Sequence, residues 1–262
     1  MLDDDKALVE ARNAYAYAPF CLRRRANSEG CVDAVLWEIP IVISGPQADD
    51  APGFANLSSV ALDRYHGQLL HSDSDDDVLL GVASVTFWGF AQGRGGRFTT
   101  ARALSRAKHI AGQGKRSADD GAAIVEAIRN IIVDLDEGRR ADAIARTMRL
   151  KHHGLAFGSK LLAFIAPATE CVYDEVISLR LEASADERLS ALHVATVGQH
   201  RLAEKARAYA GWAELCTSTA QRLDAAGLPW KDWNGEPQAW RAVDVERAFF
   251  GLGRPTSKAV TV

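Results

Sequence analysis

The stretch from residue 150 to 166 constrains the fold of this chain more than any other. Gly154 and Gly158 are followed by an apolar run, and Pro167 then ends that run. Small residues favour a turn, an apolar run of this length predicts a buried helix face, and proline cannot continue a helix. The pattern therefore predicts two helices joined by a tight turn, with Lys160 in the first turn of the second helix.

The rest of the chain after residue 56 is also mainly helical in pattern. Apolar residues recur at the three- and four-residue spacing of a helix with one buried face, and glycines or short polar stretches separate these segments. We expect helices at about 57–70, 77–90, 100–109, 117–137, 140–150, 174–182, 185–193 and 197–225. A last helix should begin near residue 237 or later and end at residue 251 or 253.

The N-terminal part has a different pattern. Residues 35–43 are the best candidate for a strand because they are rich in β-branched side chains, and residues 44–46 read as the turn that ends it. We predict a mainly α protein with a small irregular or β-containing N-terminal part over residues 1–52. A helical part over residues 53–262 follows, which we expect to form two lobes with the hairpin at 150–166.

The overall charge does not mark this chain as a nucleic-acid binder. Its formal net charge is -3 and its pI is about 6.2. Between residues 93 and 117, however, the chain has seven basic residues and no acidic one. Such a stretch could follow phosphates on an otherwise acidic protein, or it could be an ordinary solvated helix face.

Several classes of protein are not indicated. None of the four cysteines forms a C-x-x-C pair, so we expect no zinc ribbon or iron–sulfur cluster. His152 and His153 have no third ligand at a suitable spacing, and we expect neither a metal nor a cofactor. The acidic N-terminus lacks a signal-peptide pattern, and no run of about 18 apolar residues predicts a membrane span. We expect a cytoplasmic protein with reduced thiols.

Lys160 and Asp174, fourteen residues apart, are the candidate catalytic pair. A lysine in the first turn of a helix faces the positive end of the helix dipole, which favours the neutral amine that a nucleophile needs. Asp174 precedes an apolar helical segment and is a candidate N-cap, which would hold its carboxylate in one direction. A surface lysine and an ordinary helix cap are the alternative interpretation.

Residues 155–160, with the sequence LAFGSK, resemble the hairpin of the helix-hairpin-helix DNA glycosylases. In the 8-oxoguanine branch of that family, a lysine two residues after a hairpin glycine is the nucleophile, and Lys160 matches it. The segment leading to Asp174 is similar to the one that carries the family's catalytic aspartate. The short spacing is similar to that of a compact bacterial group of 8-oxoguanine-glycosylase-like proteins. Ala156 and Phe157 depart from the pattern, where the family has a glycine and a small aliphatic residue.

The resemblance extends over residues 85–252 in helical layout, although its specific part is about 25 residues around 154–180. It implies further site residues. Glu246 and Phe250 match a glutamine and a phenylalanine of the family's last core helix, and we expect them to line a base pocket with Tyr173 and Phe164. Core packing and a surface charge are the alternative. We expect DNA-phosphate contacts from Gly154, Phe157, Gly158, His153 and Arg97.

The function implied by the resemblance is a DNA glycosylase with AP-lyase activity. It would excise an oxidised or modified purine such as 8-oxoguanine through a lysine Schiff base, acting on double-stranded DNA with the modified base flipped out. A role in base-excision DNA repair or in antiphage defence follows, with a protein partner from the same operon. The alternative is a catalytically silent module that binds a nucleobase, DNA or a partner. The sequence does not indicate the oligomeric state.

Overall fold

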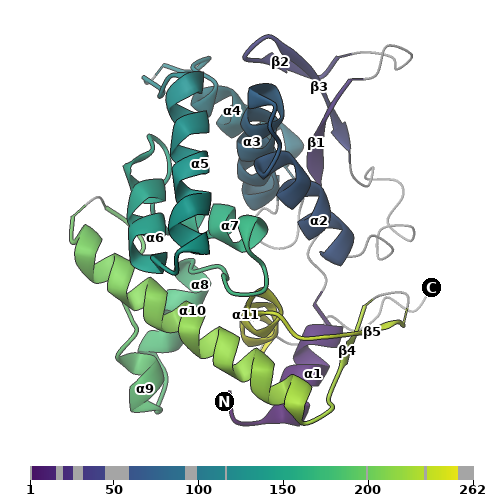
Figure 1. Cartoon of the computed structure of the whole chain (residues 1–262), viewed down its shortest axis with the longest axis vertical. Coiled ribbons are helices and arrows are strands. Elements are labelled where there is room, and N and C mark those ends of the chain that lie inside the picture. Colours follow the sequence, from purple (N-terminus) through teal and green to yellow (C-terminus); the bar gives the residue numbers. More distant parts are fainter. Residues whose placement is uncertain are drawn as a thin grey trace.

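The computed structural model describes residues 2–15, 20–25, 32–44, 59–91, 99–115, 117–198, 200–232 and 235–252. Eleven helices dominate these residues, and a small three-stranded antiparallel sheet lies near the N-terminus (Figure 1). The prediction of a mainly α fold is therefore confirmed. In these residues no helix combines the length and the apolar character needed to cross a membrane.

The elements follow the sequence in this order. The helices are α1 (Asp5–Asn13), α2 (Ser59–Leu70), α3 (Asp75–Ala91), α4 (Thr100–Ile110), α5 (Gly121–Asp136), α6 (Arg140–Arg149), α7 (Leu155–Ile165), α8 (Glu175–Glu182), α9 (Glu187–Ser190), α10 (Leu202–Ala225) and α11 (Ala242–Gly251). The strands are β1 (Cys21–Arg24), β2 (Ala34–Leu36), β3 (Ile39–Ser44), β4 (Trp230–Lys231) and β5 (Pro237–Gln238).

The predicted single strand at 35–43 is wrong, because this segment is a hairpin of β2 and β3. Trp37 and Glu38 both have positive φ, at 46° and 68°, and this backbone conformation reverses the chain between the two strands. The sequence did not predict this turn, because the turn lacks the glycine or asparagine that is typical of such turns. β3 is the middle strand and also pairs with β1.

Helix α1 was not expected in the irregular N-terminal part. Its N-cap is Asp4, whose side chain accepts a hydrogen bond from the Ala7 N–H, and Leu8 is fully buried beneath it. The helix packs against α11 and β4 rather than against the N-terminal sheet. The division of the chain at residue 52 stays a prediction.

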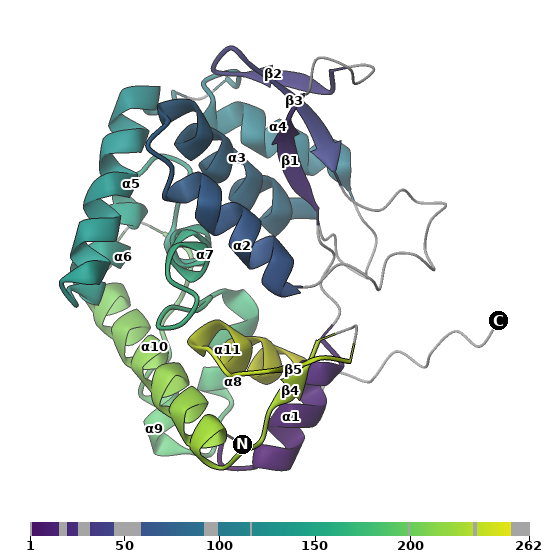
Figure 2. The same cartoon turned by 45° about the vertical axis from the view of Figure 1, so that its right-hand side comes forward.

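Helix α3 lies at the centre of one group of elements. It is apolar on every side, and twelve of its residues are buried, which is the pattern of a helix surrounded by its neighbours. It packs against α2, α4, α5, α7 and β1. Figures 1 and 2 show α2 to α6 and the sheet gathered at one end of the molecule.

A second group of elements brings the two ends of the chain together. Helices α1, α8, α9 and α11 lie at the other end of the molecule with β4 and β5 (Figure 2). The long helix α10 packs against both α11 and α6, and α7 packs against α2, α3 and α6. The segment after α7 reaches the second group, because the N–H groups of Ala242 and Val243 donate to the carbonyls of Ala168 and Pro167. Helix α7 and this segment therefore connect the two groups.

One of the expected helices has different limits, because the helix expected at 185–193 is only the short α9. The last helix begins at Ala242, in agreement with an expected start near residue 237 or later. Residues 237–238 form β5, which pairs with β4 before α11 begins. The other expected helices agree with α2 to α8 and α10 to within about five residues, a normal error for boundaries read from sequence.

Candidate functional site

The hairpin differs from its prediction in where the second helix begins. Residues 150–154 form the connection, Gly154 is the N-cap, and α7 begins at Leu155. Lys160 consequently lies in the second turn of α7, and the expectation that it lies in the first turn is wrong. The helix dipole acts mainly within the first turn, so it does not account for a neutral amine at this position.

Gly158 lies inside α7 and not in the turn. Its N–H donates to the carbonyl of Gly154 at 2.8 Å. A Cβ placed on Gly158 would come within 2.2 Å of Thr147 Oγ1 on α6. The glycine therefore serves the close packing of α6 against α7, and its N–H is already used within the helix.

Lys160 and Asp174 do lie together. Lys160 is only 6% exposed, and its Nζ lies 3.7 Å from Asp174 Oδ2. The same Nζ donates to the carbonyl of Ala156 at 3.3 Å and lies 5.3 Å from the centre of the Phe157 ring. The structure thus places a buried amine beside a carboxylate.

Asp174 is the N-cap of α8, as predicted. Its Oδ1 accepts hydrogen bonds from the N–H groups of Val176 and Ile177, at 3.0 and 3.1 Å. Because Oδ1 is held by the cap, Oδ2 is the oxygen that faces Lys160. The cap therefore also sets the direction of the carboxylate toward the amine.

Helix α10 holds the segment that leads to Asp174. The Tyr209 hydroxyl donates to the carbonyl of Cys171 at 3.2 Å, and Trp212 Nε1 donates to the carbonyl of Val172 at 3.0 Å. Both aromatic side chains are fully buried. These bonds fix the backbone of the segment against the core.

Ser159 holds the same segment from α7. It is fully buried, and its Oγ accepts a hydrogen bond from the Tyr173 N–H at 2.9 Å. Ser159 precedes Lys160 and Tyr173 precedes Asp174, so this bond ties the two candidate residues together through their neighbours. Sequence reasoning did not select Ser159, although its place beside the lysine was visible.

Glu246 on α11 is the third ionisable group of the cluster. It is 4% exposed and accepts a hydrogen bond from the Val172 N–H. Burial raises its pKa to about 8 and the charge of Asp174 adds to this shift, although Arg247 and Lys160 oppose it. Glu246 is therefore mostly protonated at neutral pH, and the idea that it is a surface charge is excluded.

Phe250 lies one turn after Glu246 on α11, as their spacing required. It is half-buried, and its ring meets that of Tyr15 edge to face, with 6.3 Å between ring centres. The part of the predicted base pocket carried by α11 thus has one buried carboxyl group and one half-buried ring.

Tyr173 and Phe164, the other two predicted pocket residues, lie in the core. The Tyr173 hydroxyl donates to the carbonyl of Leu192 at 2.7 Å, and its ring is fully buried. Phe164 is 2% exposed and packs edge to face against Trp88, with 5.0 Å between ring centres. Both rings already fill places in the protein interior.

The predicted phosphate contacts on the hairpin are all buried or half-buried. Gly154 is half-buried at the N-terminus of α7, where no side chain caps the helix. His153 is 3% exposed, and burial lowers its pKa, so it would be neutral. Phe157 is half-buried and stacks against the ring of Phe90. Arg97 lies outside the described residues.

The aliphatic stem of Lys160 lies against the end of α3. A Cβ on Gly89 would come within 2.8 Å of the Phe157 ring and 3.1 Å of Lys160 Cδ. The next residue, Phe90, stacks on Phe157 with 4.3 Å between ring centres and 18° between planes. The absence of a side chain at Gly89 leaves room for the lysine stem. This contact was not predicted.

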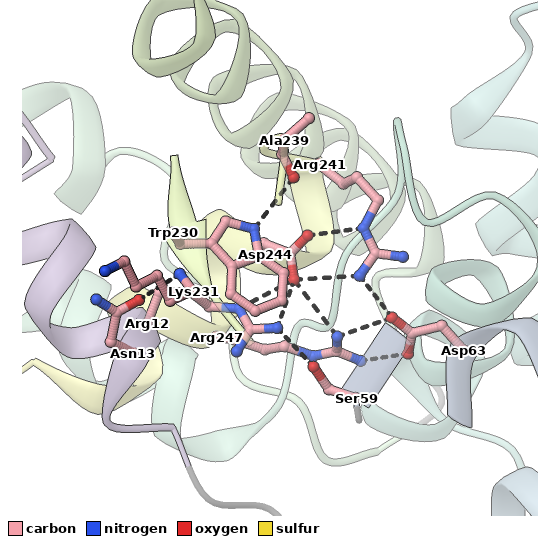
Figure 3. A network of polar contacts seen from close by, with 10 residues as sticks. All are labelled: Arg12, Asn13, Ser59, Asp63, Trp230, Lys231, Ala239, Arg241, Asp244 and Arg247. Carbon is pink, nitrogen blue, oxygen red and sulfur yellow. Dashed lines mark hydrogen bonds and ion pairs between the residues drawn. The ribbon is translucent and has the colours of Figure 1, made fainter. Parts of the chain in front are cut away.

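A buried ionic network fixes α11 in the molecule (Figure 3). Asp244 bonds to Arg12 on α1 and to Arg241, while Asp63 on α2 bonds to Arg241 and Arg247. Burial alone would raise the pKa of Asp244, but the surrounding arginines, Arg12 first, lower it to about 2. Because Glu246 belongs to the same helix, the network also sets its position.

In the described part of the chain, no group of three or more His, Cys, Asp or Glu side chains is arranged to hold a metal ion. Comparisons with protein-family models, with curated proteins and with solved structures found no match to this chain.

Proposed function

We propose that the chain is a DNA glycosylase with AP-lyase activity and a helix-hairpin-helix glycosylase fold. The observation that carries the proposal is the buried Lys160 Nζ at 3.7 Å from Asp174 Oδ2. The rigid support of Asp174 by side chains of α7, α10 and α11 adds to it. A fixed amine–carboxylate pair of this kind is what covalent catalysis at a sugar carbon needs.

The proposed reaction begins with the modified nucleotide flipped out of the duplex. Lys160 loses a proton, and its Nζ then attacks the anomeric carbon of the sugar as the bond to the base breaks. The base leaves with the bonding electron pair and takes up a proton. Ring opening gives a Schiff base between Nζ and the sugar, and loss of a C2′ proton then breaks the C3′–O bond and nicks the strand.

Asp174 has two parts in this scheme. Its carboxylate stabilises the positive charge that develops on the sugar as the base departs, and its Oδ2, 3.7 Å from Nζ, takes up the proton of Lys160. Protonated Glu246 supports the pair as a neutral neighbour, because a second ionised carboxylate beside Asp174 would repel it.

The test is borohydride trapping of the Schiff base on two duplexes, one with 8-oxoguanine opposite cytosine and one with an abasic site. We expect a covalent adduct with the parent protein and none with Lys160→Gln. Lys151→Gln is the matched control, because Lys151 is a half-exposed lysine of the same hairpin. Asp174→Asn should keep the helix cap, since asparagine caps as well as aspartate, but slow base release.

The outcomes of trapping separate the possibilities. Adduct formation that Lys160→Gln abolishes and Lys151→Gln preserves supports the proposal. Adduct on the abasic duplex alone means that the lyase chemistry is present and that another base is the substrate. If the parent protein forms no adduct on either duplex, the lyase proposal fails.

A second candidate function is a catalytically silent module that binds a nucleobase, DNA or a protein partner. The burial of Lys160 favours it, because the amine is only 6% exposed and already contacts Asp174 and the Ala156 carbonyl. A sugar could reach the amine only after these contacts open. Tight binding to modified DNA that Lys160→Gln leaves unchanged, with no base release, would favour this module.

A further inference from the structure

Helix α4 carries two arginines that pair with no carboxylate among the described residues. Arg102 and Arg106 are one turn apart on the same face of the helix, and both are exposed. The sequence has no acidic residue between 93 and 117. In the described part of the chain neither arginine takes part in an ion pair, whereas exposed Arg24 and Arg129 do.

The two guanidinium groups lie over the ring of Phe90. The Cζ atoms of Arg102 and Arg106 are 5.8 and 5.1 Å from the ring centre, within the range of a cation–π contact. Neither group makes a side-chain hydrogen bond within the described residues, and the ring restricts the position of both. Two restricted, exposed guanidinium groups suit the forked recognition of a phosphate.

The same ring leads directly to the candidate site. Phe90 stacks on Phe157, whose ring contacts the Lys160 amine. Three successive contacts therefore connect the α4 arginines to Lys160, and they involve α4, α3 and α7. A continuous series of side-chain contacts therefore leads from the two exposed arginines to the buried amine.

From this juxtaposition we infer that Arg102 and Arg106 bind backbone phosphates of the DNA whose sugar meets Lys160. The Phe90–Phe157 stack would set the separation between the phosphate contact and the amine. The inference rests on the proposed function, because it takes DNA as the ligand. It accounts for a local excess of positive charge on a chain with a net charge of -3.

The test measures binding to a fluorescein-labelled undamaged duplex by fluorescence anisotropy at several salt concentrations. We expect Arg102→Gln/Arg106→Gln to bind about tenfold more weakly or worse. Each lost phosphate contact should also reduce the slope of log K against log salt by about 0.9. Arg207→Gln on α10 is the control for Arg106→Gln, because both are exposed helical arginines without an ion pair in the described residues.

Three results would overturn the inference. The first is unchanged DNA affinity in the double variant, and the second is an equal loss in Arg207→Gln and Arg106→Gln. The third is a loss of binding to phosphatidylserine vesicles, rather than to DNA, in the double variant. A loss confined to the α4 variants, with the smaller salt slope, supports it.

Failure of this inference can be told apart from failure of the proposed chemistry. Lys160→Gln should lose the trapped adduct but keep the parent affinity for undamaged duplex. The α4 double variant should need more protein but reach the parent adduct yield on the abasic duplex at saturation. If the parent protein forms no adduct, only the proposed chemistry fails. If the double variant binds DNA as tightly as the parent, only the phosphate contact fails.

Discussion

At the scale of single residues, Gly158 was predicted to lie in a phosphate-binding turn, but its role is the close packing of α6 and α7. The sequence placed it in a phosphate-binding turn, but its Cα hydrogens face α6. A Cβ there would lie 2.2 Å from Thr147 Oγ1 and 3.0 Å from Thr147 Cβ. Thr147 is fully buried and its hydroxyl donates to the Ile144 carbonyl, so it has little room to move.

Gly158→Ala should therefore destabilise the protein. Alanine is favoured over glycine within a helix by about 1 kcal/mol, but forcing a methyl group into a filled interface costs about 1–3 kcal/mol or more. We expect a net loss in urea unfolding that is smaller in a Thr147→Ala background. Gly121→Ala is the control, because its Cβ would meet nothing closer than 3.4 Å.

Equal losses of stability for Gly158→Ala with and without Thr147 would contradict this explanation.

The candidate site was predictable from the sequence only in part. The pairing of Lys160 with Asp174 was predictable from a motif. The helix start at Leu155, the Gly89 contact and the Ser159 bond depend on which helices pack together, and no local pattern carries that information.

At the scale of elements, the ionic network decides how the two ends of the chain meet. Arg241, Asp244 and Arg247 are spaced three residues apart, so their shared helix face was readable from sequence. Their partners Arg12 and Asp63 come from α1 and α2, and nothing local identifies them. This is also why α1 was missed: its stability comes from packing on α11 as well as from its own cap.

Asp244→Asn should destabilise the protein by about 3–5 kcal/mol, because it leaves buried guanidinium groups without a balancing charge. Asp244 is fully buried and bonds to Arg12 at 2.8 Å and to Arg241 at 2.7 Å. Urea unfolding measures the loss, and hydrogen exchange in α1 should rise. Asp75→Asn is the control, because its 2.6 Å bond to Arg129 is exposed and should matter little. Similar losses in both variants would contradict the role of burial.

At the scale of the whole molecule, the fold class was predictable and the arrangement was not. Helical periodicity located α2 to α8 and α10. The central place of α3, which is apolar on every side, was not predicted. The meeting of α1 with α11, and the place of α7 between two groups of elements, depend on contacts between residues far apart in the chain. The β2–β3 hairpin was missed because its turn residues, Trp37 and Glu38, are unusual ones.

The pH dependence of stability depends on two buried groups, Glu246 on α11 and His66 on α2. Glu246 has its pKa raised from 4.5 to about 8, so the folded protein keeps a proton that the unfolded chain releases. Its contribution to stability is full below pH 4.5 and is lost as the pH rises through 8. Burial lowers the pKa of His66 from 6.5 to about 3, so its contribution is full above pH 6.5 and is lost toward pH 3.

The two contributions oppose each other between pH 4.5 and 6.5, and above pH 6.5 only that of Glu246 still changes. We therefore expect the free energy of unfolding of the parent protein to fall from pH 6.5 to 8.5, by at most about 1.4 kcal/mol per pH unit. Glu246→Gln should be nearly flat over this range and should exceed the parent in stability at pH 8.5. Urea unfolding of both proteins across the range measures this difference. Parallel curves would mean that Glu246 is ionised in the folded protein. The proposal that a protonated Glu246 supports the Lys160–Asp174 pair would then fail too.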